Sequence, residues 1–357
     1  MLHYSGRFFL MKLRVMKGYE VTIGIPFFCS ADYIKESLES ALSQTFKSIE
    51  FLLIDDCGGD GTLSVVQELK THHLRGNDIR IISHDYNKGV AVSRNEIIDE
   101  ANGEYLFFMD SDDVISKETI SLLMKNARQY DAEIVFGSYE RIELSGEKSV
   151  YQYPSLKLFG ENVLASYAYR KYAGIQASAC NFLVKTSVLR EHNHRFIDTK
   201  YWEDFVFTFD LVTLISRAVL LPDITYSYFC RTGSLSNYQQ RNNISKAEIL
   251  RNVHSIDHLK KTSSILYNKV YFPNRCFNIV MTDFYIACHI LKCKKGIHPR
   301  FSSKEIKTII QHPATWSQIW HFKHARIKNI FLFVVGKLPS SICVATVWSL
   351  GKMKKLI

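Results

Sequence analysis

The chain has 357 residues, of which 46% are hydrophobic and 22% are charged. These values are ordinary for a soluble globular protein, and the length predicts about two domains. The formal net charge is +10, but the charge is uneven: residues 292–357 hold 13 Lys or Arg and one acid, Glu305. The rest of the chain then has 32 bases and 34 acids. A nearly neutral body argues against a nucleic-acid-binding protein.

The eight cysteines form no CxxC pair and no zinc-ligand spacing, so we expect free thiols in a reducing cytosol. Near the start of the chain, the apolar run "FFLM" is too short for the core of a signal peptide. Regular patterning begins near Glu20. We therefore expect residues 1–19 to be an N-terminal extension, with Met11 or Met16 as alternative starts.

Short apolar runs alternate with amphipathic stretches from Glu20 to about Gly137. The runs have the length of strands buried on both faces, and the stretches have helical spacing. The expected strands are 20–26, 49–55, 79–85 and 104–110, and the expected helices are 32–45, 62–74 and 90–101. This order predicts an α/β fold, a parallel sheet with helices on both faces. One more helix at 117–130 and one more strand at 132–142 extend the pattern.

The pattern is mixed between about 150 and 235. Strands are expected at 178–186 and 218–231, and a helix at 202–215. From about 243 onward the sequence is helical. Four prolines interrupt this last region, namely Pro273, Pro299, Pro313 and Pro339.

The stretch "EYLFFMDSDDV", residues 104–114, ends an apolar run with Asp110, Asp112 and Asp113. Carboxylates this close repel each other unless a cation or hydrogen-bond donors lie among them. If residues 107–112 are extended, Asp110 and Asp112 point to the same side, where they suit a hard divalent cation such as Mn²⁺ or Mg²⁺. Asp113 is expected at the N-terminus of a helix that begins at Ser116.

Three other interpretations of the three acids compete with a divalent-cation site. An EF-hand loop from Asp110 fails, because Ile115 and Ser121 stand where Gly and Glu are needed. A haloacid-dehalogenase-like phosphatase fits "LFFMDSDDV" locally, although about three βα units precede it here. A solvated acidic loop is the third alternative.

Five segments, in order, resemble the inverting glycosyltransferase family 2, which has the GT-A fold. They are "VTIGIPFFCSADYIKESLESALSQTF", "FLLIDDCGGDGT", "DYNKGVAVSRNEIIDEANGEYLFFMDSDD", "YWEDFVFTFDL" and "ITYSYFCRTGSLS". The resemblance runs from about Val21 to Ser236. It implies a Rossmann-like GT-A catalytic domain at 20–240, with a donor-binding half at 20–137 and an acceptor half at 138–240. A mostly helical, basic C-terminal region then occupies 241–357.

The chain departs from the family pattern at three places. Phe28-Cys29 stands where Tyr-Asn is usual, and Cys57-Gly58 where Gly-Ser is common. The Gln-x-x-Arg-Trp motif of processive synthases is absent, since "QQRNN" lacks the tryptophan. We therefore expect transfer of a single sugar.

On the donor side, the resemblance implies that Asp56 accepts a hydrogen bond from the nucleobase and that Pro26 and Phe27 line the base pocket. Arg94 is expected beside the nucleotide, because its fork suits phosphate or a base carbonyl. The alternative for Arg94 is a surface ion pair.

The same resemblance implies that Asp110, Ser111 and Asp112 hold the ribose and the metal, with Asp112 as the stronger metal ligand. Arg231 is expected to reach the diphosphate, with Ser234 or Ser236 nearby.

On the acceptor side, Asp204 is implied as the general base that takes the proton of the acceptor hydroxyl. Glu203 and Trp202 support the acceptor. The alternative is that Glu203 and Asp204 only cap a helix.

The resemblance thus implies transfer from a nucleotide-diphospho-sugar, with UDP favoured, to a hydroxyl of a glycan or lipid-linked acceptor in cell-surface polysaccharide synthesis. The phosphatase and a non-catalytic homologue that binds nucleotide or membrane remain the alternatives.

Residues 315–357 mix aromatic, apolar and basic residues, and Lys337 and Pro339 interrupt the apolar part. No uninterrupted span of about 20 apolar residues exists. A tail of this kind suits the inner face of the cytoplasmic membrane, which predicts a cytoplasmic, peripheral protein. The alternative is a helical appendage packed on the catalytic domain.

Overall fold

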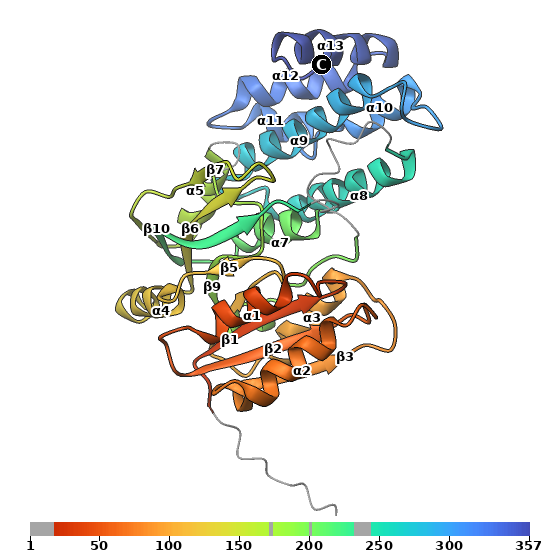
Figure 1. Ribbon diagram of the computed structural model, residues 1–357. Coiled ribbons are helices and arrows are strands. Elements are labelled where there is room, and N and C mark those ends of the chain that lie inside the picture. The colour runs from red at the N-terminus through yellow and green to blue at the C-terminus, as the bar shows by residue number, and fades with distance from the viewer. Residues whose placement is uncertain (1–17, 171–173, 200–201, 232–243) are drawn as a thin grey trace, which may run out of the picture.

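The computed structural model describes residues 18–170, 174–199, 202–231 and 244–357 (Figure 1). Its first half lies at the bottom of Figure 1 and its last helices at the top, with α7 (Glu203–Leu211) between them. The polar residues predicted at positions 234 and 236 lie outside the described residues.

The predicted alternation of strands and helices is confirmed in the first part of the chain. Its four strands pair in the order β3-β2-β1-β4, all parallel, and Val21 lies between Ile49 and Tyr105 in register. Every residue of β1, β2 and β4 is buried, as their continuous apolar sequences predict. The elements are β1 (Val21–Phe27), α1 (Ile34–Leu42), β2 (Ile49–Asp55), α2 (Thr62–His72), η1 (Gly76–Asp78), β3 (Ile79–Ser83), α3 (Val90–Glu100) and β4 (Tyr105–Phe108).

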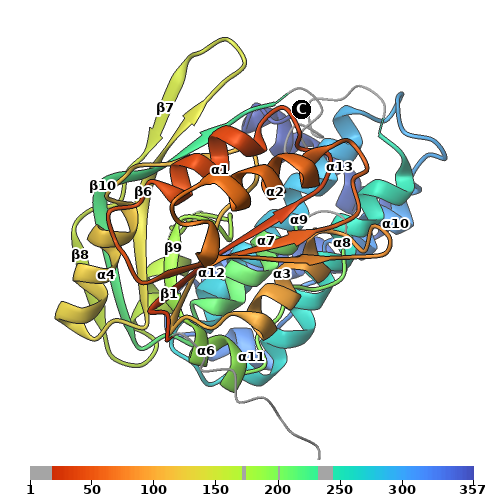
Figure 2. The ribbon, with the colours of Figure 1, turned by 60° about the horizontal axis from the view of Figure 1, so that its bottom comes forward.

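The sheet then becomes mixed, so the expectation of a parallel sheet holds only for this first part. Strand β9 lies antiparallel between β4 and β6, and β6 runs parallel to β10. Short edge strands complete the ten-stranded sheet, and the β6–β7 hairpin projects from the body (Figure 2). The added elements are β5 (Val114–Ile115), α4 (Thr119–Tyr130), β6 (Ile134–Ile142), β7 (Lys148–Tyr151), β8 (Leu156–Phe159), α5 (Val163–Arg170), β9 (Phe182–Lys185), α6 (Thr186–Glu191) and β10 (Arg217–Phe229).

The C-terminal region is helical, as predicted. Its elements are α8 (Lys246–Ser263), η3 (Ser264–Leu266), α9 (Phe272–Lys292), α10 (Ser303–Ile309), α11 (Trp316–Trp320), α12 (Arg326–Lys337) and α13 (Ser340–Met353). Ser302 with Glu305 and Thr315 with Gln318 form capping boxes that start α10 and α11. Among the residues that the structure describes, no helix combines the length and the apolar character needed to cross a bilayer.

Helix α7 belongs to both halves of the molecule. Phe207 and Leu211 pack in the core under the sheet, whereas Val206 packs among the C-terminal helices. Arg275 of α9 is fully buried and donates to Asp210 of α7 at 2.5 Å and to the Tyr169 hydroxyl at 2.7 Å. The C-terminal region therefore holds α7 in place, and the division of domains at residue 240 stays a prediction.

Candidate active site

The three acids after β4 do not lie on an extended strand. Strand β4 ends at Phe108, and the Asp113 N–H donates back to the Asp110 carbonyl at 3.4 Å across a turn. The alternation predicted for residues 107–112 therefore does not apply. A turn instead lets three neighbouring carboxylates take three different surroundings.

Asp113 is buried and ties this turn to β10. Its carboxylate accepts from the Tyr226 hydroxyl at 2.8 Å and from the Phe229 N–H at 2.9 Å. Burial, and then the charge of Asp110, raises the pKa of Asp113 well above its usual range. The prediction that Asp113 begins a helix is wrong, since α4 begins only at Thr119 and the carboxylate is used for a long-range contact.

Asp112 remains partly exposed on the turn. Burial and the charge of Asp110 raise the pKa of Asp112 to about 6, against the opposing charge of Arg231. The Arg231 guanidinium donates to the Asp112 carbonyl at 2.8 Å and lies over the Tyr33 ring at 4.2 Å. Arg231 thus lies next to the acids, as its predicted role requires.

Arg94 joins two acids that are far apart in sequence. It is 5% exposed and donates to Asp110 at 2.8 Å and to Glu203 at 2.9 Å. Burial alone lowers its pKa, but Asp110 and Glu203 outweigh burial and raise it. The alternative of a surface ion pair is wrong. The buried Nε of Arg94 has no hydrogen-bond partner among the described residues.

Glu203 and Asp204 lie in the first turn of α7, as predicted, where the Asp204 carboxylate accepts from the Phe205 N–H and the N-cap residue Trp202 makes no side-chain capping bond. The residue before them, Trp202, has a left-handed φ of 64°, a strained conformation for a bulky side chain and one that occurs at functional sites. Burial raises the pKa of Glu203, opposed by Arg94. Burial and the neighbouring Glu203 raise the pKa of Asp204 to about 7. A carboxyl that titrates near neutrality is suited to general-base chemistry.

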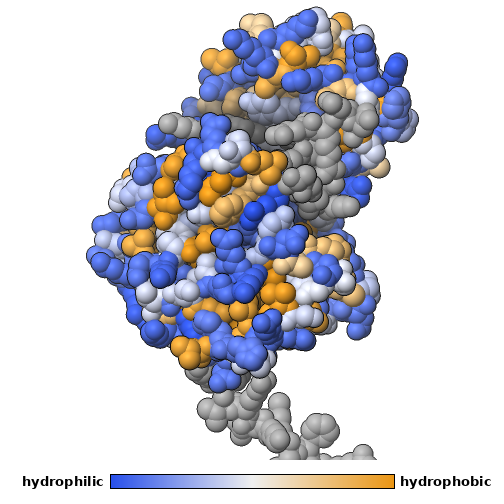
Figure 3. Space-filling model, in the orientation of Figure 1, coloured by the Kyte–Doolittle hydropathy of each residue, from blue (hydrophilic) through white to orange (hydrophobic). Residues whose placement is uncertain are grey.

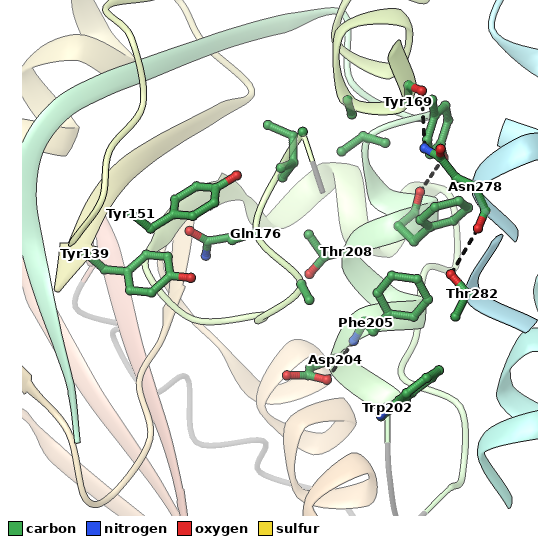
Figure 4. Close-up of a pocket in the computed structure, with 16 residues that line it drawn as sticks. Tyr139, Tyr151, Tyr169, Gln176, Trp202, Asp204, Phe205, Thr208, Asn278 and Thr282 are labelled. Carbon is green, nitrogen blue, oxygen red and sulfur yellow. Dashed lines mark hydrogen bonds between the residues drawn. The ribbon is translucent and has the colours of Figure 1, made fainter. Parts of the chain in front are cut away.

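Asp204 faces a cavity of about 410 Å³. Tyr139 and Tyr151 lie on one side of this space, and Asn278 and Thr282 of α9 lie on the opposite side (Figure 4). Sequence reasoning missed all four residues. Nothing in their local sequence marks them, because three separate segments bring them together.

At the other end of the sheet edge, Asp56 is buried in a network of donors. It accepts from the backbone N–H groups of Lys88 at 2.7 Å and Gly89 at 2.9 Å, and it lies 2.7 Å from His84 Nδ1. A carboxylate offers about four acceptor positions, and these contacts occupy three of them in a side chain that is 5% exposed. Its neighbour Asp55 instead accepts from the Cys57 N–H at 3.1 Å.

The first loop presents a different aromatic residue than expected. Pro26 and Phe27 are buried in β1, and Phe27 is only 2% exposed, so its side chain is not open to a nucleobase. Phe28 is 49% exposed and is the aromatic side chain at this edge. Strand β1 extends to Phe27, one residue further than we expected, so Phe27 is buried with the rest of the strand and Phe28 lies beyond its end. The hydroxyl oxygen of Ser111 lies 2.8 Å from the hydroxyl oxygen of Ser30, which belongs to the loop after β1.

The donor set at Asp110 and Asp112 fits a divalent cation that shares its coordination with a substrate. No cluster of three or more His, Cys, Asp or Glu that would hold a metal alone occurs among the described residues. Mg²⁺ and similar ions are often held by one or two carboxylates together with substrate phosphates and water. Burial, and then the charge of Asp110, raises the pKa of Asp112, and a cation beside it would oppose both effects.

Comparison with known proteins agrees with this architecture. The family model described as Glycosyl transferase family 2 matches residues 22–191, a range that ends before Asp204 and Arg231. The cholesterol galactosyltransferase of Borreliella burgdorferi is 26% identical over 62% of this chain and 63% of its own length, so the chain spans less than two thirds of that relative. Glycosyltransferase GlyG of Streptococcus pneumoniae is 24% identical over 60% of this chain and 72% of its own length.

Among solved structures, S. aureus TarS residues 1–349 in complex with UDP-GlcNAc is similar with a TM-score of 0.55. The alignment covers 89% of this chain and 90% of that one at 17% identity, which establishes a shared fold. The phosphatase alternative finds no support in these matches, and β4 lies inside the sheet between β1 and β9 rather than beginning the fold.

We predict that Asp112→Asn stabilises the protein at pH 8 in a buffer with a metal chelator. A carboxyl whose folded pKa of about 6 exceeds its unfolded value of about 3.9 opposes folding once it is ionised. The free energy of unfolding of the wild type should therefore fall between about pH 4 and pH 6 relative to the variant. Urea denaturation at pH 4 and pH 8 measures this gap, and Asp223→Asn, at an exposed position, is the control. A gap that does not grow with pH contradicts the assignment.

Proposed function

We propose that the protein is a metal-dependent, inverting glycosyltransferase, because residues 22–191 match the family model described as Glycosyl transferase family 2. It would move one sugar from a nucleotide-diphospho-sugar to an acceptor hydroxyl. The observation that carries the proposal is the Arg94 bridge, which joins Asp110 on the donor side to Glu203, the neighbour of Asp204, on the acceptor side.

The donor is proposed to lie along the edge formed by the ends of β1, β2 and β4, where open α/β sheets bind ligands. Asp56 offers its remaining acceptor position to the base, and Asp110, Ser111 and Asp112 face the ribose and diphosphate. A bound Mn²⁺ or Mg²⁺ at Asp110 and Asp112 would neutralise the leaving diphosphate. Arg231, beside the Asp112 carbonyl, adds positive charge there. UDP is the favoured nucleotide, because the similar TarS fold was solved with UDP-GlcNAc.

Asp204 is proposed as the base of a single displacement. Its ionised carboxylate takes the proton of the acceptor hydroxyl while that oxygen forms a bond to the anomeric carbon of the donor sugar. The bond from that carbon to the diphosphate oxygen breaks, and the nucleoside diphosphate leaves with the bonding electrons. Attack from the opposite face inverts the configuration. Asp204 accepts from the Phe205 N–H at 2.7 Å, which fixes its orientation.

We expect Asp204→Asn to lower kcat by about 10²- to 10⁴-fold, because it removes the proton acceptor. The dissociation constant of the donor should stay within about twofold, since the residue does not contact the donor in this account. In the wild type, kcat should rise with pH through about 7, where Asp204 loses its proton. Isothermal calorimetry and a coupled nucleotide-release assay give both quantities, with Asp223→Asn as control.

An equal loss of donor binding and turnover in Asp204→Asn would contradict the role of base. Unchanged turnover in Asp204→Asn would show that Asp204 is not the base.

We further propose that the C-terminal helices rest on an anionic membrane surface, which places a lipid-linked or cell-surface glycan acceptor within reach. Helix α12 exposes Ile327, Phe331 and Val334 along one face, at the spacing of an apolar stripe. Trp320 and Trp348 are also exposed, and aromatic side chains of this kind favour the membrane interface. Figure 3 shows hydrophobic and hydrophilic residues intermixed over these helices at the top of the molecule. The C-terminal helices also pack on the rest of the protein, because the other faces of α12 and α13 are buried in a cluster that includes Val206 of α7. Both interpretations of the C-terminal region can therefore hold together.

We expect the wild type to co-sediment with vesicles that contain phosphatidylglycerol and to bind neutral phosphatidylcholine vesicles less, with binding that weakens in high salt. Phe331→Glu should weaken binding at least about fivefold, because a carboxylate replaces an inserted apolar group. Leu74→Glu is the matched control, since Leu74 is 99% exposed but lies after α2, in the other half of the chain. Equal losses in both variants, or no preference for anionic vesicles, would contradict the proposed surface.

A further inference from the structure

The cavity beside Asp204 is built by three parts of the chain. Strands β6 and β7 supply Tyr139 and Tyr151, helix α7 supplies Trp202, Phe205 and neighbouring residues, and α9 supplies Asn278 and Thr282 (Figure 4). Its volume of about 410 Å³ lies in the range of small-molecule sites. Because α7 and α9 lie beyond residues 22–191, the part of the chain that the family model matches does not by itself enclose this space.

Six of the sixteen residues that line the cavity are aromatic. Tyr139 and Tyr151 stack with 5.2 Å between ring centroids and 15° between ring planes, and Trp202 meets Phe205 edge to face. Such walls present flat apolar surface to a ring-shaped ligand. The one ionisable acid among the described lining residues is Asp204, and none of those residues is Lys, Arg or His.

The two cations near the reacting groups are not among the described residues that line the cavity. Arg94 joins Asp110 on the donor side to Glu203 on the acceptor side, and Arg231 contacts Asp112. An anionic group inside the cavity would lose its water among aromatic side chains and would meet the Asp204 carboxylate. An uncharged group avoids both the loss of hydration of a charge and the repulsion from Asp204.

Helix α9 is held firmly enough to act as a wall. The buried Arg275, one turn before Asn278, bonds Asp210 of α7, Tyr169 of α5 and Ser263 of α8, the last at 2.8 Å. Asn278 itself donates to the Tyr169 carbonyl at 3.2 Å. These contacts fix the distance across the cavity between α9 and α7.

We propose that this cavity, completed by α9, binds the acceptor as an uncharged ring alcohol, with one ring face against the tyrosine pair and a hydroxyl directed to Asp204. The proposal rests on the transferase function proposed above and names its acceptor class. Two sources share this chemistry, the terminal sugar ring of a glycan and the hydroxylated ring of a lipid such as a sterol. A polyol phosphate, whose charges flank the reacting hydroxyl, is excluded from the cavity.

The test uses the full chain, and donor binding is measured first by calorimetry. Turnover is then compared with three acceptors: phenyl β-glycosides, cholesterol in detergent micelles, and a glycerol phosphate oligomer. We expect turnover with a neutral ring acceptor and at least about tenfold lower kcat/KM with the phosphate oligomer. Preference for glycosides identifies a glycan source, and preference for cholesterol identifies a lipid source.

Two variants then test the cavity itself. Thr282→Phe fills it from α9, outside the catalytic machinery, and should raise the acceptor KM at least about tenfold with an unchanged donor dissociation constant. Thr282→Val is the matched control and should stay within about twofold of the wild type. Should Thr282→Phe fail to fold, Tyr151→Leu at the partly exposed strand β7 replaces it and should raise the acceptor KM in the same direction.

Preference for the phosphate oligomer overturns the inference, as does an unchanged acceptor KM in a folded cavity variant. Either of these results overturns only the proposed acceptor class, and the proposed transferase function stands as long as the nucleotide donor binds. Failure of the wild type to bind any nucleotide donor instead overturns the proposed function itself.

Discussion

The site depends on the two ion pairs that the buried guanidinium of Arg94 makes. Arg94 brings together Asp110, at the end of β4, and Glu203, at the start of α7, although 93 positions separate them in the chain. Without the cation, Glu203 would be left as an unpaired carboxylate that is largely buried, and removing one partner of a buried ion pair typically costs about 3–5 kcal/mol. By fixing both acids, Arg94 sets the position of the neighbouring Asp112 and Asp204.

The acids around Arg94 carry more negative charge than it neutralises. Burial and mutual repulsion raise the pKa of Asp112, Asp113, Glu203 and Asp204. Such an arrangement lowers the stability of the unliganded fold and is typical of sites shaped for function. Asp113 is compensated by bonds to β10, and Glu203 by Arg94, whereas Asp112 and Asp204 have weaker compensation. These two are the residues that we propose for metal binding and for proton transfer.

Local sequence was enough to predict the framework. The four parallel strands and the intervening helices follow from apolar run length and helical spacing, and "EDF" at the start of an apolar helix placed Glu203 and Asp204 correctly. What local sequence does not contain is long-range pairing. The antiparallel pairing of β9 with β4, the bond from Tyr226 to Asp113 and the Arg94–Glu203 contact each join segments more than 70 positions apart. The contribution of α9 to the cavity is also a long-range contact. Strand β1 ends one residue later than we expected, which buries Phe27 and leaves Phe28 exposed.

The central claim is that the carboxylates after β4 hold a cation that carries a nucleoside diphosphate. Its most direct test is calorimetry with UDP, GDP, dTDP and CDP, each with and without Mn²⁺, on the wild type and on Asp112→Asn. The account predicts tight, Mn²⁺-dependent binding of one diphosphate, with UDP favoured, and loss of that binding in the variant. Absence of binding to all four, or binding that is the same in the variant and without Mn²⁺, would contradict it.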